Sequence, residues 1–107
     1  MSRKLFVLVR NDLSKSQQAV QAGHAVATFC AEEFRRSHWN GRDFEHIPAR
    51  WFNETLVYLK GGDLKELEGF RAECKETWAF YEPDIGNEMT AFAVLDPPDW
   101  FDMLPLL

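Results

Sequence analysis

The chain has 107 residues, which suits one domain and is too short for two, so we expect a single domain over residues 1–107. It is 46% hydrophobic and 27% charged, a balance typical of folded globular proteins that argues against disorder. The formal net charge of -5 argues against broad, non-specific nucleic-acid binding, which needs a basic surface. The first 50 residues nevertheless carry 8 Lys/Arg against 5 Asp/Glu, so a local basic patch stays open to this half.

Cysteine usage and the N-terminal sequence give three further expectations. Cys30 and Cys74 are too few for a disulfide framework, and because each falls among apolar residues of an expected helix, we expect two buried thiols. No cluster of Cys and His has metal-ligand spacing, so we expect no metal site. The apolar run before Arg10 is too short for a signal peptide or a membrane span, which predicts a cytoplasmic protein without membrane contact.

The first predicted element is a strand over Lys4–Val9, "KLFVLV", an unbroken apolar run of the kind that is covered on both faces. Turn residues Asn11 and Asp12 follow it. Ser14 and Gln17 then have the spacing of a capping box, which places the start of a helix near residue 15.

That first helix shows small and apolar residues at steps of three and four, which indicates one buried face ending near Arg36. The residues on this face are Ala19, Ala22, Gly23, Val26, Ala27, Cys30 and Phe34. Because the side chains near its start are small, we expect the adjacent sheet to approach the helix backbone closely there.

The middle of the chain opens with Ser37–Arg50, a polar and aromatic segment without a period, which we interpret as a functional or partly mobile loop. A second strand is predicted over Thr55–Leu59 and ends before two glycines. Asp63 and Glu66 form another capping-box spacing. The second helix then buries a stripe made of Leu64, Leu67, Phe70 and Cys74.

The last third of the chain contains two more predicted strands, Trp78–Tyr81 and Thr90–Leu95. Asp96, Pro97 and Pro98 are expected to start a last short helix, with proline in its first turn. Its apolar residues Trp100, Phe101 and Leu104 are expected to pack back onto the sheet.

The resulting order, β-α-β-α-β-β-α, predicts a three-layer α/β domain with a four-stranded mixed sheet flanked by helices. Clefts in such folds open beyond the carboxyl ends of parallel strands, where Arg10, Asn11 and the start of the first helix lie. Lys15 occupies the first turn of that helix, although the helix dipole favours acidic residues there. Lys15 can therefore be interpreted either as a functional cation or as an ordinary solvated lysine.

One stretch of the sequence, "VLVRNDLSKSQQAVQAGHA" (residues 7–25), resembles the signature of the type II peptidyl-tRNA hydrolase family. That signature has a strand ending V-R-[TN]-D-L, a lysine motif ending K-G-K, and a helix containing Q-x-x-H-A. The final strand, "TAFAVLDPP", is similar to the closing strand of the family, and the resemblance extends over nearly the whole chain.

The resemblance implies an esterase that acts in translation, cleaving the bond between a peptide and the 3′ end of tRNA, with a mixed sheet and no metal or cofactor. It also implies a homodimer, for which the apolar segments 80–83 and 100–107 offer surface. Lys15 matches the first lysine of the family's K-G-K, and Asp84 matches the aspartate of a loop before the last strand. Both are therefore candidate catalytic residues, Asp84 as a base or as the group that orients a water. Substrate-binding roles are implied for Arg10, Asn11, Gln21, His24 and Thr90.

Two departures from the family pattern favour the alternative of a non-catalytic RNA- or protein-binding module. Gln17 stands where the family has a second lysine, and the loop before Thr90 is about six residues shorter. Single residues also have plain structural interpretations: His24 as a packed core residue, Gln21 as a solvated helix residue, and Asp84 as a turn residue. A continuous basic strip would favour tRNA binding, and it would run through Arg10, Lys15, Arg35, Arg36 and Arg42.

Overall fold

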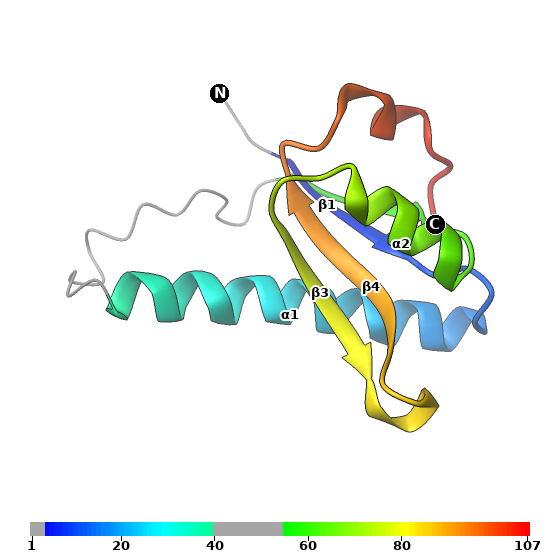
Figure 1. Ribbon diagram of the computed structural model, residues 1–107, viewed down its shortest axis with the longest axis horizontal. Helices are drawn as coiled ribbons and strands as arrows, with labels where there is room; N and C mark the ends of the chain where they lie inside the picture. The colour runs from blue at the N-terminus through cyan, green and yellow to red at the C-terminus, as the bar shows by residue number, and fades with distance from the viewer. Residues whose placement is uncertain (1–3, 40–54) are drawn as a thin grey trace.

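The computed structural model describes residues 4–39 and 55–107, and for residues 36–39 it describes the backbone alone. The described residues contain four strands: β1 (Lys4–Val9), β2 (Thr55–Lys60), β3 (Thr77–Glu82) and β4 (Glu88–Leu95). They form one sheet in the order β2-β1-β4-β3. β1 and β2 are parallel, whereas β4 runs antiparallel to both of its neighbours, which confirms the predicted mixed sheet (Figure 1).

Helices cover both faces of this sheet, as the three-layer prediction requires (Figure 1). The long helix α1 (Lys15–Trp39) lies on one face, and α2 (Leu64–Ala72) lies on the other. Two short 3₁₀ helices complete the described part of the chain: η2 (Pro83–Ile85) and η3 (Asp99–Met103). α1 ends at Trp39, three residues beyond the end predicted near Arg36.

The central strand β1 is covered on both sides, as its unbroken apolar sequence predicts. All residues from Leu5 to Val9 are buried. Because side chains alternate along a strand, Val7 and Val9 join the core under α1, while Leu8 joins the core on the α2 side. Every side chain of β1 from Leu5 onward thus contributes to one of two hydrophobic cores.

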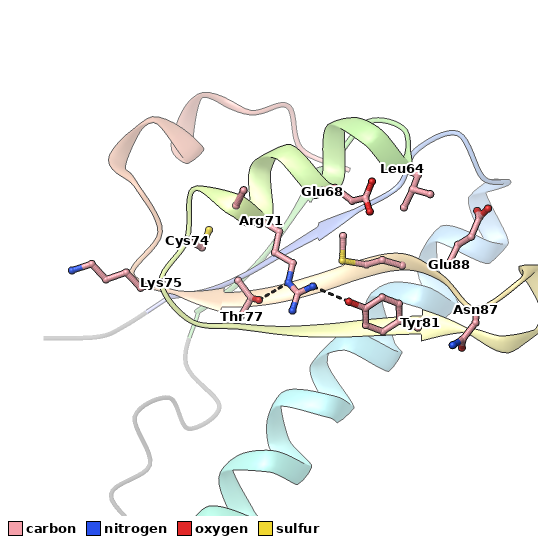
Figure 2. Close-up of a pocket in the computed structure, with 11 residues that line it drawn as sticks. Leu64, Glu68, Arg71, Cys74, Lys75, Thr77, Tyr81, Asn87 and Glu88 are labelled. Atoms are coloured by element: carbon pink, nitrogen blue, oxygen red, sulfur yellow. Dashed lines mark hydrogen bonds between the residues drawn. The ribbon is translucent and has the colours of Figure 1, made fainter.

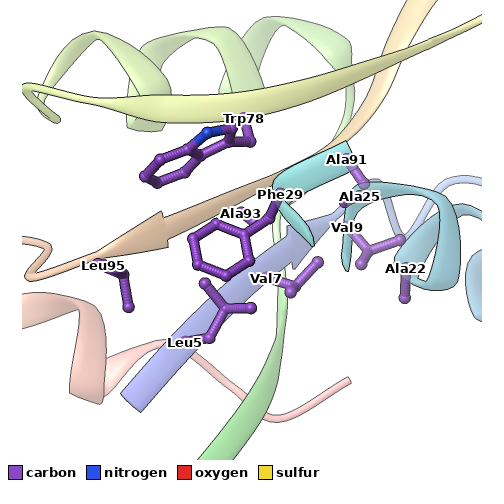
Figure 3. Close-up of a cluster of buried hydrophobic side chains, with 10 residues drawn as sticks. All are labelled: Leu5, Val7, Val9, Ala22, Ala25, Phe29, Trp78, Ala91, Ala93 and Leu95. Atoms are coloured by element: carbon purple, nitrogen blue, oxygen red, sulfur yellow. The ribbon is translucent and has the colours of Figure 1, made fainter. Parts of the chain in front are cut away.

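The core between α1 and the sheet is built from small residues at one end and aromatic residues at the other (Figure 3). Four alanines from α1 and β4 belong to it: Ala22, Ala25, Ala91 and Ala93. Further along α1, the ring of Phe29 packs edge-on against Trp78, with ring centroids 4.8 Å apart. Of the small residues expected to face the sheet near the start of α1, Ala22 does so, whereas Ala19 and Gly23 are exposed.

The predicted buried face of α1 is correct for Ala22 and Val26 and wrong for its other members. The residues of α1 that pack on the sheet are Gln21, Ala22, Ala25, Val26 and Phe29. Most of the predicted face is exposed instead, namely Ala19, Gly23, Ala27 and Cys30, and Phe34 is 50% exposed. Periodicity failed here because α1 carries apolar residues on two opposite sides, and it is the side with Phe29 that packs against Trp78.

The predicted burial of the two thiols is correct only in part. Cys30 is exposed, because it lies on the side of α1 that faces away from the sheet. Cys74 lies just after α2 rather than inside it, and its Sγ donates to the carbonyl oxygen of Phe70 at 3.5 Å. Partial burial, and to a lesser degree the nearby negative charge of Glu73, raises the pKa of the Cys74 thiol to about 11.

On the opposite face, α2 and η3 close the second core. The capping box predicted at the start of α2 is present, with Asp63 and Glu66 bonded reciprocally. Leu67 and Phe101 are fully buried in this core, whereas Trp100 is 44% exposed and rests against the ring of Phe101. The last helix therefore packs onto the sheet mainly through Phe101.

The C-terminal segment pairs with the outer edge of β2. The N–H of Lys60 donates to the carbonyl of Pro105 at 2.8 Å, and the N–H of Leu107 donates to the carbonyl of Tyr58 at 3.1 Å. Leu106 forms an isolated antiparallel bridge with Leu59. An edge strand with free backbone groups is prone to pair with another chain, so this segment protects β2.

Candidate functional site

The carboxyl ends of the parallel strands β1 and β2 are fastened to each other by Asn11. Val9 is in register with Lys60, so the loops that follow the two strands begin side by side. The side-chain oxygen of Asn11 accepts the N–H of Gly62 at 2.7 Å, and the N–H of Asn11 donates to the carbonyl of Gly62 at 3.0 Å. Asn11 therefore positions the loop that leads into α1.

Arg10, at the end of β1, is almost fully buried, with 8% of its surface exposed. Its guanidinium donates two hydrogen bonds to the carboxylate of Asp12, at 3.0 and 2.9 Å, and a third to Glu88 at 2.9 Å. It also reaches the carbonyl of Met89 at 3.4 Å. The carboxylates of Asp12 and Glu88 raise the already high pKa of Arg10, and Arg10 in turn lowers the pKa of Asp12. These contacts indicate a clamp between β1 and β4 and leave little of Arg10 exposed to a substrate.

Gln21 and Thr90 are both buried and lie in contact between α1 and β4. Gln21 is 6% exposed and Thr90 is fully buried. The hydroxyl of Thr90 donates to Oε1 of Gln21 at 2.7 Å. The interpretation of Gln21 as a solvated residue is therefore wrong. The contact engages the amide oxygen, so the Nε2 group of Gln21 is the end of the side chain that can donate to a ligand.

Gln21 and Asp84 line the same hollow, which we call the Asp84 pocket. It has a volume of about 290 Å³ and lies between the first turns of α1 and η2. Its lining consists of Leu13, Ser16, Gln17, Val20, Gln21, Glu82, Asp84 and Ile85. The lining thus combines two acidic residues from the end of β3 and from η2 with two glutamines and a serine from α1, and Leu13, Val20 and Ile85 are its apolar residues. Two of the predicted site residues, distant in sequence, are brought together here.

Lys15 does not line the Asp84 pocket. It lies on the other side of the first turns of α1, in a second hollow of about 510 Å³ that we call the Lys15 pocket. This hollow is lined by Asn11, Lys15, Gln18, Ala19, Tyr58, Lys60, Leu106 and Leu107. Two lysines and one tyrosine therefore share it. The two residues expected to be catalytic, Lys15 and Asp84, face separate pockets with the helix start between them.

The start of α1 carries the capping box that the sequence predicts. The N–H of Ser14 donates to Oε1 of Gln17, and the N–H of Gln17 donates to Oγ of Ser14, both at 3.3 Å. The first N–H groups of a helix have no acceptor within the helix, so those of Lys15 and Ser16 stay available to a ligand. The positive end of the helix dipole therefore lies between the two pockets.

His24 belongs to neither pocket. It is exposed, and its ring stacks on Phe80 of β3 with centroids 4.4 Å apart and planes 14° from parallel. The interpretation of His24 as a packed core residue is therefore wrong. The reason is the same shift in helix position, which turns residue 24 toward the edge strand instead of under the sheet.

The continuous basic strip expected for tRNA binding is interrupted. Arg10 is buried among carboxylates, and Arg35 pairs with Glu32 at 2.8 Å on the surface. The side chain of Arg36 and all of Arg42 lie outside the described residues. The sequence analysis missed one cation, Lys60, although its position could have been predicted. It ends β2 and therefore lies beside the end of the parallel strand β1.

Glu82 is the second residue that sequence reasoning missed, because it lies at the end of a strand and carries no motif. It shares the Asp84 pocket, so it is the natural comparison for any role of Asp84. No group of three or more His, Cys, Asp or Glu side chains within residues 4–35 and 55–107 has the arrangement of a metal site. Among the residues that the structure describes, no helix is both long and apolar enough to cross a membrane.

A further hollow of about 530 Å³ lies on the α2 side of the molecule (Figure 2). Arg71 lies at its centre and donates from Nε to Thr77 and from Nη1 to Tyr81, both at 2.8 Å. These two bonds join α2 to β3 across the hollow. No sequence pattern indicated this link, because Arg71 has the pattern of an ordinary arginine at the end of a helix.

The fold and the two pockets at the start of α1 define the class of the protein: an α/β protein with a mixed four-stranded sheet and a candidate site where α1 meets the end of β3. No protein-family model matches the chain, and no curated protein matches it. The resemblance to type II peptidyl-tRNA hydrolases therefore rests on the motif residues alone, those of residues 7–25 and of the final strand.

Proposed function

We propose that the protein is an esterase that hydrolyses the bond between a peptide, or an N-blocked amino acid, and the 3′ end of tRNA. The observation that carries this proposal is the Asp84 pocket, in which Asp84 and the buried Gln21 line one hollow. Ester hydrolysis needs a base for the attacking water and donors for the oxyanion, and these are the groups the pocket offers.

In this mechanism the carboxylate of Asp84 accepts a proton from a water whose oxygen attacks the ester carbonyl. The carbonyl oxygen becomes an oxyanion that accepts hydrogen bonds from Nε2 of Gln21 and from the N–H of Ser16. The intermediate then collapses and the bond to the ribose oxygen breaks. That oxygen takes the proton from Asp84, which releases tRNA and leaves the peptide with a free carboxyl group.

Thr90 acts here as a positioning residue. Its hydroxyl holds the amide oxygen of Gln21, so that the Nε2 group is presented to the pocket in a fixed orientation. The apolar side chains of Val20 and Ile85 suit the side chain of the residue that carries the ester. Arg10 and Asn11 hold the loop and the strand ends on which this arrangement depends.

The Lys15 pocket suits the nucleotide part of the substrate. Lys15 and Lys60 supply two positive charges beside the start of α1, where phosphate binds favourably. Tyr58 offers an aromatic surface in the same hollow. The helix start would then separate the phosphate from the ester, with the terminal ribose between the two pockets. This division assigns Lys15 to binding rather than to the chemical step.

The second candidate, a binding module without catalysis, is favoured by two observations. Lys15 and Asp84 line different hollows, and the basic strip expected for tRNA binding is interrupted, because Arg10 and Arg35 pair with carboxylates. The two functions are separated by using two tRNA substrates, one with an N-acetylated amino acid in ester linkage and one with the same group in amide linkage. The esterase binds both and releases the acyl group from the first alone. A module binds both with equal affinity and releases nothing from either.

A further inference from the structure

The hollow of about 530 Å³ around Arg71, which we call the Arg71 hollow, takes no part in the proposed function. It lies between α2 and the edge strand β3, on the face of the sheet opposite α1 (Figure 2). Its volume falls within the range of small-molecule sites, about 300–1,000 Å³. Its lining includes four charged residues, Glu68, Arg71, Lys75 and Glu88.

Arg71 is held in place by neutral partners and not by a carboxylate. Its Nε donates to Oγ1 of Thr77 and its Nη1 donates to the hydroxyl of Tyr81, both at 2.8 Å. Within residues 4–35 and 55–107, no carboxylate forms an ion pair with it. The guanidinium therefore lies fixed against β3 with its positive charge uncompensated there, and its Nη2 group can donate to a ligand.

The two hydroxyls extend this set of donors. Each accepts from Arg71 through its oxygen, so each keeps its own O–H for another acceptor. Thr77 and Tyr81 both line the hollow, and Lys75, exposed between α2 and β3, adds a second positive charge. These donors suit the oxygens of an anion, and the planar guanidinium suits a carboxylate in particular.

Glu68 brings the opposite charge into the same hollow without pairing with Arg71. The two residues lie three positions apart on α2, a spacing at which opposite charges commonly pair. In the part of the chain that the structure describes, the carboxylate of Glu68 has no ion pair and no side-chain hydrogen bond. Glu88, by contrast, is already bound to Arg10. The hollow therefore holds one positive and one negative group that are separate and available to a ligand.

We propose that the Arg71 hollow binds a free α-amino acid with an apolar side chain. The carboxylate of the ligand accepts hydrogen bonds from Arg71 and from the hydroxyls of Thr77 and Tyr81. The ammonium group of the ligand pairs with Glu68. Apolar residues of the same hollow suit the side chain of the ligand, namely Leu64, Ala72 and Met89. Inorganic phosphate fits less well, because it has no ammonium group and its second negative charge is repelled by Glu68.

This site is distinct from the Asp84 pocket, although both lie at the end of β3. Tyr81 lines the Arg71 hollow on the α2 side, whereas the next residue, Glu82, lines the Asp84 pocket on the α1 side. Binding of an amino acid here requires no esterase activity, so the inference stands or fails separately from the proposed function.

The test follows the backbone amide signals of the wild-type protein by NMR while matched compounds are added. L-leucine carries both charges, leucinamide lacks the carboxylate, and isocaproate lacks the ammonium group. We expect saturable shifts around residues 71, 77 and 81 with L-leucine, and at least tenfold weaker binding of the other two. Equal binding of all three, tighter binding of inorganic phosphate, or shifts confined to the Asp84 pocket would overturn the proposal. The absence of saturable binding by L-leucine would overturn it as well.

Two variants assign the charges. Glu68→Gln removes the partner of the ammonium group, so L-leucine should bind at least tenfold more weakly while the binding of isocaproate does not weaken. Glu73→Gln is the matched control, since Glu73 is exposed just after α2 and does not line the hollow, and it should change neither. Arg71→Lys loses the planar donor group and should weaken both carboxylates at least tenfold but not leucinamide.

Arg71 also joins α2 to β3, so its replacement can weaken the fold. Glu68→Gln removes no hydrogen bond or ion pair of the described chain, so it tests the proposal even where Arg71→Lys does not fold. A Glu68→Gln variant that binds L-leucine as tightly as the wild type does would contradict the proposed ammonium partner.

Discussion

The hydroxyl of Thr90 donates a 2.7 Å hydrogen bond to Oε1 of Gln21, and this contact joins the start of α1 to the centre of the sheet. Both side chains are buried, so neither has water as an alternative partner. The contact fixes the orientation of Gln21, the buried one of the two glutamines that line the Asp84 pocket. This pair therefore contributes both to the stability of the fold and to the proposed chemistry.

Replacing Thr90 with valine tests that link. Thr90→Val keeps the shape of the side chain but leaves the buried Oε1 of Gln21 without its donor, which costs about 1–3 kcal/mol of unfolding free energy. We expect esterase activity to fall about tenfold, because the amide is no longer held in one orientation. Denaturant unfolding and the rate of ester cleavage are the two measurements.

The double variant Gln21→Met, Thr90→Val separates the two effects. Removing both partners of a buried hydrogen bond with side chains of similar shape is close to neutral for stability. We expect stability to return toward that of the wild type while activity stays low. Recovery of activity together with stability would mean that the amide plays no part in the reaction.

The clamp around Arg10 predicts a defined dependence of stability on pH. Arg10 lowers the pKa of Asp12, so the folded state favours the ionised carboxylate more than the unfolded state does. The stabilisation is complete above the unfolded pKa of about 4 and is lost as the pH falls through the lower folded value. Because the Asp12 side chain is 41% exposed, solvent screens this pair, so Asp12→Asn should cost less than about 1 kcal/mol at pH 7, and the difference should shrink below about pH 4. A difference that stays constant down to pH 2 contradicts the ion pair.

The two lysines of the Lys15 pocket are predicted to act on binding. Lys15→Ala and Lys60→Ala each remove one phosphate contact, so we expect KM for the tRNA substrate to rise about tenfold with kcat nearly unchanged. The dependence of KM on salt concentration should become shallower in both variants. Lys65→Ala, an exposed lysine on α2, is the matched control. A loss of kcat in Lys15→Ala at unchanged KM would instead place Lys15 at the oxyanion.

The C-terminal segment is predicted to stabilise β2 and keep its edge from pairing. Removing residues 105–107 exposes backbone groups of β2, which should lower the unfolding free energy by about 1–3 kcal/mol and promote aggregation at high concentration. Leu106→Ser keeps the backbone contacts, and Leu106 is 71% exposed, so that variant should change stability by less than about 0.5 kcal/mol. Thermal unfolding and light scattering compare the two.

The fold was predictable because its signals are local and strong. The apolar runs that became β1 and β4, and the capping boxes at Ser14 and Asp63, each depend on neighbouring residues. The mixed sheet followed from two strands without a helix between them. These signals do not require knowledge of which distant residues meet.

The orientation of α1 and the details of the site depend on contacts that local signals do not contain. Small residues on opposite sides of α1 left its burial undecided, and the contact between Phe29 and Trp78 settles it in three dimensions. For the same reason, Gln21 was not recognisable as a buried residue, nor His24 as an exposed one. The separation of Lys15 from Asp84 depends on which side of a single helix turn each one faces.

The most direct test of the proposed activity is cleavage of N-acetylated aminoacyl-tRNA by the wild type, Asp84→Asn and Glu82→Gln. Each variant removes one carboxylate from the same pocket, so the change in charge is the same in both. A difference between them therefore reports which carboxylate was lost. We predict that kcat/KM falls at least a hundredfold in Asp84→Asn and less than fivefold in Glu82→Gln. Full activity in Asp84→Asn, or no cleavage by the folded wild type, would contradict the assignment of this pocket as an esterase site.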